Sequence, residues 1–279
     1  MAKIIDGKAV SARIKAEIRQ EIEAEKLKVG LAVVIVGSDP ASRVYVNNKK
    51  KDCEACGIIS FEYALPGDTT NDELLELIGT LNEDPKINGI LVQQPLPKQI
   101  NVQSVNERIS ALKDVDAFRF ENMGRIVDGN FNFLPCTPGG IMDLLHSENI
   151  SVSGKECVVV GRSNIVGKPM AMLLLHENAT VTICHSKTVD LAAICRRADV
   201  LIAAVGKKGI ITADMIKPGA VVIDVGMNKN DEGKLCGDVD FAAVAEKSSY
   251  ITPVPGGVGP MTRAILMKNT IKAYRLQKT

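Results

Sequence analysis

The chain has 279 residues, of which 46% are hydrophobic and 24% charged, and its formal net charge is only +1. This length allows two modest domains with their own cores, and the hydrophobic share is typical of a soluble α/β protein. The balanced charge excludes the general attraction that nucleic acid or an anionic membrane requires, so we expect neither as a partner.

The N-terminus and the cysteines indicate a cytoplasmic protein. Charged residues interrupt the first ten positions, unlike a secretion signal or transit peptide, and no apolar stretch has membrane-spanning length. Seven cysteines, an odd number spread over the chain, favour reduced thiols. Cys53 and Cys56 form a C-x-x-C pair, but they fall late in an expected helix and no second pair completes a zinc site. We therefore expect no metal.

The first part of the chain alternates between helices and short apolar strands. Apolar residues four apart predict a helix over 8–26, and the following patterns predict strands over 31–36, 59–65 and 87–92. Helices are expected between them, over 41–57, 71–81 and 102–109. This alternation predicts an α/β domain with a parallel sheet.

The helix over 41–57 carries the first candidate chemistry. Ser42, Tyr45 and Lys49 stand three and four residues apart, so they share one face, with the Lys49 amine one turn from the Tyr45 hydroxyl. Lys50 and Lys51 point elsewhere and, as nearby cations, would lower the pKa of Lys49. The alternative is that the three lysines are only a solvated charge run.

Polar residues also follow the strand over 87–92. Gln93 and Gln94 come at its carboxyl end, where parallel sheets gather groups that face ligands, although two glutamines can equally well cap a strand. The charged turn from Lys113 to Ala117 then precedes a loop and would ordinarily be read as a linker. A helix is expected from Ile141.

Residues 157–175 predict a strand, a glycine turn and a helix that opens at Lys168 and Pro169. Gly161 can adopt backbone conformations barred to other residues, so free N–H groups and the helix dipole are expected to face one spot, which suits a phosphate. The match to the dinucleotide fingerprint is imperfect, because Ser163 replaces the second glycine and the third is displaced to Gly167. A turn that merely links strand to helix is the alternative.

The following strand, over 179–184, indicates which dinucleotide binds. It ends in His185, Ser186, Lys187 and Thr188, without the carboxylate that would hold the ribose of NAD. Ser186 and Lys187, together with Arg162, could receive a ribose 2′-phosphate, so we expect NADP. Further strands over 200–205 and 220–225 complete a mononucleotide-binding half-fold.

The last strand, over 250–254, enters a loop rich in glycine and proline. Pro255, Gly256 and Gly257 begin this loop, which would let the backbone approach a flat ligand closely. A final helix is expected over 261–276.

Seven stretches together resemble one family, the bifunctional methylene-tetrahydrofolate dehydrogenases and methenyl-tetrahydrofolate cyclohydrolases, and the similarity covers essentially the whole chain. They are Ser42-x-x-Tyr45-x-x-x-Lys49-x-Lys51, Gly89 to Gln93, Lys113 to Asp116, Pro135 to Pro138, Val160 to Pro169, Cys184 to Thr188 and Pro253 to Thr262.

The resemblance implies a function. The expected enzyme oxidises 5,10-methylene-tetrahydrofolate with NADP and hydrolyses the methenyl product to 10-formyl-tetrahydrofolate, in one-carbon metabolism and purine biosynthesis. Lys49 would be the catalytic cation of the hydration, Tyr45 would orient it and stack near the pterin, Gln93 would hydrogen-bond it and Asp116 would hold the pterin. The remaining substrate contacts would be Pro255, Gly256 and Gly257, and the cofactor contacts Gly161, Arg162, Ser163, Val166, Gly167, Ser186 and Thr188.

The resemblance also implies an architecture: two α/β domains with a cleft between them, and a homodimer through the nucleotide domain. Residues 1–119, completed by the helix over 260–279, would form the folate domain with its parallel sheet, and residues 120–259 a Rossmann-type NADP domain. Gln94 stands where the family usually has leucine, and Ala117, followed by Phe118, where it usually has glycine.

Two other function classes compete with this interpretation. One is a different NADP-linked dehydrogenase with an α/β substrate domain, and the other is a non-catalytic nucleotide sensor. Neither needs a Tyr45 and Lys49 pair, which therefore favours the bifunctional enzyme.

Overall fold

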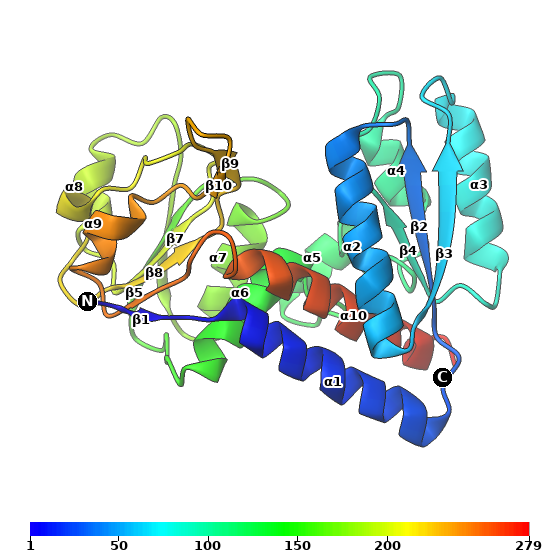
Figure 1. Cartoon of the computed structure of the whole chain (residues 1–279), viewed down its shortest axis with the longest axis horizontal. Helices are drawn as coiled ribbons and strands as arrows, with labels where there is room; N and C mark the ends of the chain where they lie inside the picture. The colour runs from blue at the N-terminus through cyan, green and yellow to red at the C-terminus, as the bar shows by residue number, and fades with distance from the viewer. Residues whose placement is uncertain (279) are drawn as a thin grey trace. The chain divides into compact units, whose positions relative to one another are not determined.

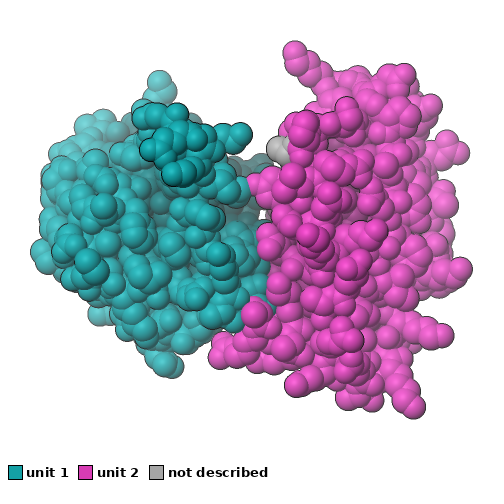
Figure 2. All heavy atoms as spheres, in the orientation of Figure 1, with its two compact units in different colours: residues 1–11, 137–262 teal, residues 12–136, 263–279 magenta. Residues whose placement is uncertain are grey.

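The computed structural model describes residues 1–278, and the chain divides into two compact units, coloured separately in Figure 2. Unit 1 comprises Met1–Ser11 and Thr137–Thr262, and unit 2 comprises Ala12–Cys136 and the chain from Arg263 onward. These boundaries differ from the expected ones, because the N-terminal segment falls in unit 1 and residues 120–136 fall in unit 2. Both units are α/β with parallel sheets, as the sequence predicted.

Unit 2 contains a three-stranded parallel sheet of order β3-β2-β4. Its elements are α1 (Gly7–Glu25), which begins in unit 1, β2 (Gly30–Val36), α2 (Pro40–Cys56), β3 (Ile59–Leu65), α3 (Asn71–Glu83), β4 (Gly89–Val92), α4 (Val102–Arg108), α5 (Phe120–Asp128) and the end of α10 (Val258–Leu276). The expected strands and helices are present with small shifts of their ends. Helix α5 was expected to be loop.

The core of unit 2 explains why β2 is apolar along its whole length. Ala32, Val34 and Val36 pack in one cluster with Leu74 and Ile78 of α3 and with residues of β4 and α4. The alternate residues of a strand point to the opposite face, and these are also buried in β2. A central strand covered by helices on both sides needs apolar residues at every position.

Helix α2 has clear signals at both ends. The Asp39 side chain accepts a hydrogen bond from the Ser42 backbone N–H at 2.7 Å, Pro40 occupies the first turn, and Gly57 ends the helix with φ of 80°. These caps fix the register of the helix that carries Tyr45 and Lys49.

Unit 1 contains a six-stranded sheet of order β1-β11-β8-β7-β5-β6, in which every pair is parallel. Its strands are β1 (Lys3–Ile4), β5 (Glu156–Val160), β6 (Thr180–Cys184), β7 (Val200–Ala203), β8 (Val221–Asp224) and β11 (Tyr250–Ile251), and β9 (Asn228–Lys229) and β10 (Leu235–Cys236) form a separate antiparallel pair. The helices are α6 (Cys136–Ser147), α7 (Gly167–His176), α8 (Leu191–Cys195), the 3-10 turn η1 (Ala213–Met215) and α9 (Phe241–Ala245).

The N-terminus belongs to unit 1 because of β1. Lys3 pairs with Tyr250 and Ile4 with Ile251, so the first strand of the chain extends the sheet beside β11. A strand of two residues is too short to show an alternation of apolar and polar positions, so it could not be predicted from the sequence.

The strand order of unit 1 reverses beside β5. The chain runs from β5 to its neighbour β6 at the sheet edge, then crosses to β7 on the other side of β5. Figure 1 shows α8 and α9 near one another in this unit, and residues of α8, η1 and α9 share a buried cluster with β5, β7 and β8. In open α/β sheets ligands bind outside the carboxyl ends of the strands at such a reversal, here beyond β5 and β7.

Among the described residues, no helix combines the length and the hydropathy that crossing a membrane needs.

Candidate active site

Lys49 of α2 meets the residue that follows β4. Its Nζ donates a hydrogen bond to Oε1 of Gln93 at 2.9 Å, and Nε2 of Gln93 donates to the backbone oxygen of Gln94. Because the amide nitrogen is engaged with the backbone, the amide oxygen faces the amine. Tyr45, one turn before Lys49, is 36% exposed.

Only one of the three consecutive lysines is enclosed by the protein. Lys49 is half-buried, whereas Lys50 and Lys51 are exposed. The pKa of Lys49 is lowered, first by burial and then by the Arg263 guanidinium, while Asp116, Cys136 and Cys53 act to raise it. The sequence attributed the lowering to Lys50 and Lys51. This was wrong in its cause, because the structure assigns the effect to burial and to an arginine distant in the chain.

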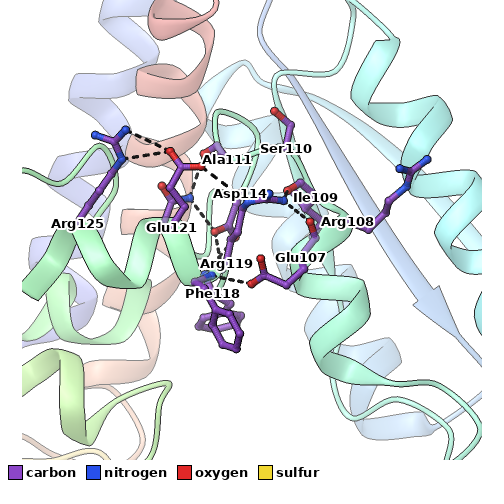
Figure 3. Close-up of polar contacts among 12 residues, drawn as sticks. Glu107, Arg108, Ile109, Ser110, Ala111, Asp114, Phe118, Arg119, Glu121 and Arg125 are labelled. Carbon is purple, nitrogen blue, oxygen red and sulfur yellow. Dashed lines mark hydrogen bonds and ion pairs between the residues drawn. The ribbon is translucent and has the colours of Figure 1, made fainter.

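Asp116 lies in a turn that is built around the neighbouring carboxylate, Asp114. The buried Asp114 accepts hydrogen bonds from the backbone N–H of Phe118 at 3.2 Å, from that of Arg119 at 2.9 Å, and from Nδ2 of Asn122 at 2.8 Å. Figure 3 shows the Asp114 carboxylate among these donors. Burial raises the pKa of Asp114 to about 6 although the three hydrogen bonds act in the opposite direction. What reads in the sequence as a linker is therefore a packed turn that places Asp116.

Arg119 fastens the same turn to the end of α4. Its guanidinium donates to the backbone oxygens of Glu107 and Ile109, the latter at 2.8 Å, and the Glu107 side chain accepts from the backbone N–H of Phe120 at 2.7 Å. These contacts, drawn in Figure 3, join α4 to α5 across the turn.

The turn also explains the departure from the family at residue 117. Ala117 has φ of 59°, in the left-handed region that favours glycine, and its side chain is buried. Asp116 itself is half-buried. The alanine thus holds a backbone conformation that glycine adopts more easily.

Glycine is required twice in the turn after β5. Gly161 has φ of 137°, and a Cβ there would lie 2.3 Å from the Ala204 oxygen; a Cβ at Gly167 would lie 2.2 Å from the Gly161 oxygen. The turn therefore passes close to the chain after β7 and to itself. It lies at the strand reversal, the place where open α/β sheets bind their ligands.

The helix start in this turn differs from the expectation. Helix α7 begins at Gly167, before Lys168 and Pro169, and Oγ of Ser163 accepts from the backbone N–H groups of Val166 at 3.1 Å and Gly167 at 3.4 Å. The expectation of free N–H groups was wrong for these two residues, because a hydroxyl of the chain already caps them. The serine at the second fingerprint position thus has a capping role.

Donors from two neighbouring strand ends could meet a ribose phosphate. Val160 of β5 pairs with Cys184 of β6, so the residues that follow each strand emerge at the same sheet edge. Arg162, Ser186 and Lys187 are exposed there. Oγ1 of Thr188 accepts from the His185 backbone N–H at 2.8 Å, which shapes the second turn.

The loop after β11 is packed against the start of α1. Gly256 has φ of 117°, and a Cβ at Gly7 would lie 1.8 Å from the Gly257 oxygen. Pro255 is exposed, whereas both glycines are buried. Part of the glycine signal read as ligand approach is therefore explained by the chain's own packing.

Two buried carboxylates near the cofactor edge gave no signal in the sequence. Asp238 accepts from the backbone N–H groups of Val205 at 2.7 Å, Gly206 at 3.0 Å and Lys207 at 2.8 Å, and so fixes the loop after β7. Asp224 accepts from the backbone of Asp238 at 2.9 Å, and burial raises its pKa to about 6. Aspartates between strands are common in sequences, so only the hydrogen bonds in the folded protein reveal the structural role of these two.

The cysteines are enclosed thiols. All seven are free and six are buried, including Cys53 and Cys56, whose pKa values burial raises to about 12. Cys136 is buried beside Asp116, and burial raises its pKa as well. Thiols of this kind are poor nucleophiles at neutral pH.

Comparison with known proteins gives a consistent result for both parts of the chain. Residues 5–116 match the family model described as tetrahydrofolate dehydrogenase/cyclohydrolase, catalytic domain, and residues 135–278 match its NAD(P)-binding domain. The chain is 58% identical to a bifunctional protein FolD of Acetivibrio thermocellus over 279 residues, 99% of this chain and 98% of the relative.

Solved structures agree. The crystal structure of the bifunctional enzyme FolD from Campylobacter jejuni has a TM-score of 0.96 and 48% identity, covering 99% of this chain and 100% of that one. The Trypanosoma brucei methylenetetrahydrofolate dehydrogenase-cyclohydrolase, solved with NADP cofactor and inhibitor, has a TM-score of 0.94 and 37% identity over 99% of this chain and 98% of that one.

Proposed function

The chain belongs to the tetrahydrofolate dehydrogenase/cyclohydrolase family, and from this premise we propose which of its residues carry the two reactions. It is a bifunctional enzyme that oxidises 5,10-methylene-tetrahydrofolate to the methenyl form with NADP and hydrolyses that product to 10-formyl-tetrahydrofolate. Unit 1 holds the cofactor turn, and Lys49, Gln93, Tyr45 and Asp116 belong to unit 2.

The cofactor contacts follow from the turn at the strand reversal. Gly161 and Gly167 let the backbone of the turn approach neighbouring backbone more closely than a side chain would allow, and Arg162 with Ser186 offers donors to a 2′-phosphate from two adjacent strand ends. Ser163, Val166 and Thr188 complete this set through the caps that shape the two turns. NADP supplies the hydride acceptor when bound, while these residues orient it.

Lys49 is the proton carrier of the hydrolysis. Water adds to the methenyl carbon and loses one proton to the medium. The hydroxyl that remains loses its proton as the formyl C=O forms, one carbon–nitrogen bond opens, and its nitrogen gains a proton. An amine whose pKa is lowered by burial gives up its own proton more readily and can then accept and return one in these steps. Gln93 fixes the amine without adding charge, and the hydrogen bond between them is the observation that carries the proposal.

Substrate binding is assigned to residues around this amine and to the loop after β11. Asp116 acts on Lys49 electrostatically, and its carboxylate offers acceptors for the N–H groups of a pterin. Tyr45 gives a partly exposed ring on the same helix face for stacking. Pro255, Gly256 and Gly257 are the remaining proposed contacts. Hydride transfer brings both ligands together, and the cleft expected from the sequence stays a prediction.

The deciding experiment replaces Lys49 with Met, which keeps the length of the side chain and removes the proton chemistry. We expect methenyl hydrolysis to fall by at least about 100-fold, the contribution typical of a general acid or base, while NADPH formation is reduced but measurable. Methenyl-tetrahydrofolate then accumulates. Both rates are followed spectrophotometrically on the same protein.

Lys50→Met and Lys51→Met are the matched controls, because both side chains are exposed on the same helix. They should retain both activities. If Lys49→Met hydrolyses the methenyl substrate as fast as these controls, the solvated charge run is the right interpretation of the lysines. A loss of both activities in equal measure would instead favour a binding role.

The assembly and location are also part of the proposal. We propose a homodimer through the nucleotide domain, since β6 is an edge strand of the sheet and its Ile183 is exposed. Light scattering tests this. We further propose a cytoplasmic enzyme of purine biosynthesis, because seven free cysteines suit a reducing compartment and the formyl product is a one-carbon donor.

A further inference from the structure

We propose that Asp52 is a positioning residue for the hydrolysis: it holds the Arg263 guanidinium beside Lys49 and neutralises it, and thereby sets the pH range in which Lys49 works. The inference rests on the proposed role of Lys49. It assigns a function to a buried ion triad that neither the folate-binding nor the cofactor-binding residues include.

The triad joins three helices of unit 2. Asp52 of α2 is buried, with its carboxylate oxygens shared between Lys15 of α1, whose Nζ lies 2.8 Å from Oδ1, and Arg263 of α10, whose Nε lies 2.5 Å from Oδ2. Both cations keep about a quarter of their side chains exposed, whereas Asp52 is buried and depends on both partners for its stability there.

The triad lies next to the reacting amine. Asp52 follows Lys49 by three residues on α2, which places the two on neighbouring turns of one helix face. Among the groups that chiefly set the pKa of Lys49, Arg263 is the basic one and Asp116 the carboxylate, while Cys136 and Cys53 are buried thiols. Gln93 adds a neutral hydrogen bond. The arginine therefore repels the Lys49 cation, and Asp52 limits that repulsion.

The direction of each effect follows from Coulomb's law. Removal of the Arg263 charge lets Lys49 hold its proton more tightly, so its pKa rises. Removal of the Asp52 charge leaves the arginine without its counter-ion, so the pKa of Lys49 falls further. The direct attraction of the Asp52 carboxylate for the Lys49 ammonium acts in the same direction and remains when the arginine is absent, whereas the part of the effect that depends on the arginine disappears.

The test titrates Lys49 directly. The protein is labelled with lysine carrying ¹³C at Cε, the Lys49 resonance is assigned by its loss in Lys49→Met, and its pKa is measured in four proteins: the parent, Asp52→Asn, Arg263→Gln and the double variant. We expect a fall of about one pH unit in Asp52→Asn and a rise of similar size in Arg263→Gln, the scale of a partly screened charge pair. The Asp52→Asn change should shift the pKa of Lys49 less in the Arg263→Gln background than in the parent. Thermal unfolding checks that each variant is folded.

The hydrolysis rate gives a second readout. In each variant, the apparent pKa of the hydrolysis rate that is due to Lys49 should shift in the same direction as the pKa measured by NMR. The pH dependence of NADPH formation should not change. Lys15→Met is the matched control: it removes the other cation of the triad but leaves the Asp52 and Arg263 pair, so the pKa of Lys49 should stay within about 0.3 units of the parent.

The outcomes separate the inference from the proposed function. Equal pKa values of Lys49 in the parent and Asp52→Asn overturn the inference, and so does an Asp52→Asn shift that is undiminished in the Arg263→Gln background. If the pKa of Lys49 shifts in the variants while the pH profile of hydrolysis does not, the electrostatic coupling is supported and the proposed role of Lys49 in hydrolysis is refuted.

Discussion

The turn that places Asp116 should make the stability of the protein depend on pH through Asp114. The perturbation is Asp114→Asn, which keeps the shape of the side chain and one acceptor oxygen. Oδ2 receives the two shorter hydrogen bonds, from Arg119 and Asn122, and Oδ1 only the 3.2 Å bond from Phe118. The variant should therefore fold while losing the titration.

The magnitude follows from the pKa of the carboxyl group. Burial raises it from its ordinary value of 3.8 to about 6, so the folded protein holds this proton more tightly than the unfolded chain does. The contribution of Asp114 to the free energy of unfolding thus grows as the pH falls through 6, and it is complete below 3.8. Between pH 7 and pH 4 it amounts to about 2 kcal/mol in favour of the folded state.

The assay is urea unfolding of the parent and the variant at closely spaced pH values from 4 to 7.5, followed by circular dichroism. The difference in unfolding free energy between them isolates Asp114 from the other carboxylates, which titrate in both proteins. Asp68→Asn, an exposed carboxylate before α3, controls for the general effect of removing one negative charge.

The unfolding free energy of the parent should rise by about 2 kcal/mol relative to that of the variant as the pH falls from 7 to 4. A difference that is constant with pH would refute the reasoning, because it would mean that the three hydrogen bonds to the carboxylate fully offset its burial. A difference that grows with rising pH would show that they dominate it.

Three other predictions concern the cofactor turn and the thiols. Arg162→Ala should weaken NADP binding by at least about tenfold in a fluorescence titration and scarcely affect NAD binding, because only NADP offers a 2′-phosphate to pair with. The control Lys155→Ala, before β5 at the opposite sheet edge, should change neither affinity, and equal losses for both cofactors would contradict the assignment. Gly167→Ala should cost more than about 2 kcal/mol in unfolding free energy, since its Cβ would lie 2.2 Å from a backbone oxygen, whereas Gly124→Ala in α5, where a Cβ meets nothing within 4 Å, should cost nothing. Thiol titration of the native protein should give about one fast-reacting cysteine, Cys236, because the other six are buried, and more than two would argue against the described packing.

The local pattern of the sequence was sufficient for most of the fold. Apolar runs bounded by glycine and proline located the long strands and helices to within a few residues, since burial on both faces imposes continuous hydrophobicity on strands such as β2. Motif spacing was sufficient for the family, and the helical repeat alone placed Lys49 on a different face from Lys50 and Lys51.

Only the tertiary structure decided how distant segments combine. The pairing of β1 with β11 and the anchoring of the loop after β7 by Asp238 join residues that no local period connects. The surroundings of Lys49 are the sharpest case, because the arginine that repels its charge lies more than two hundred residues away in the chain. Local propensity acts over a few residues, whereas burial and electrostatic interaction depend on distance in space, so the sequence determined which elements form and the fold decided which charges meet.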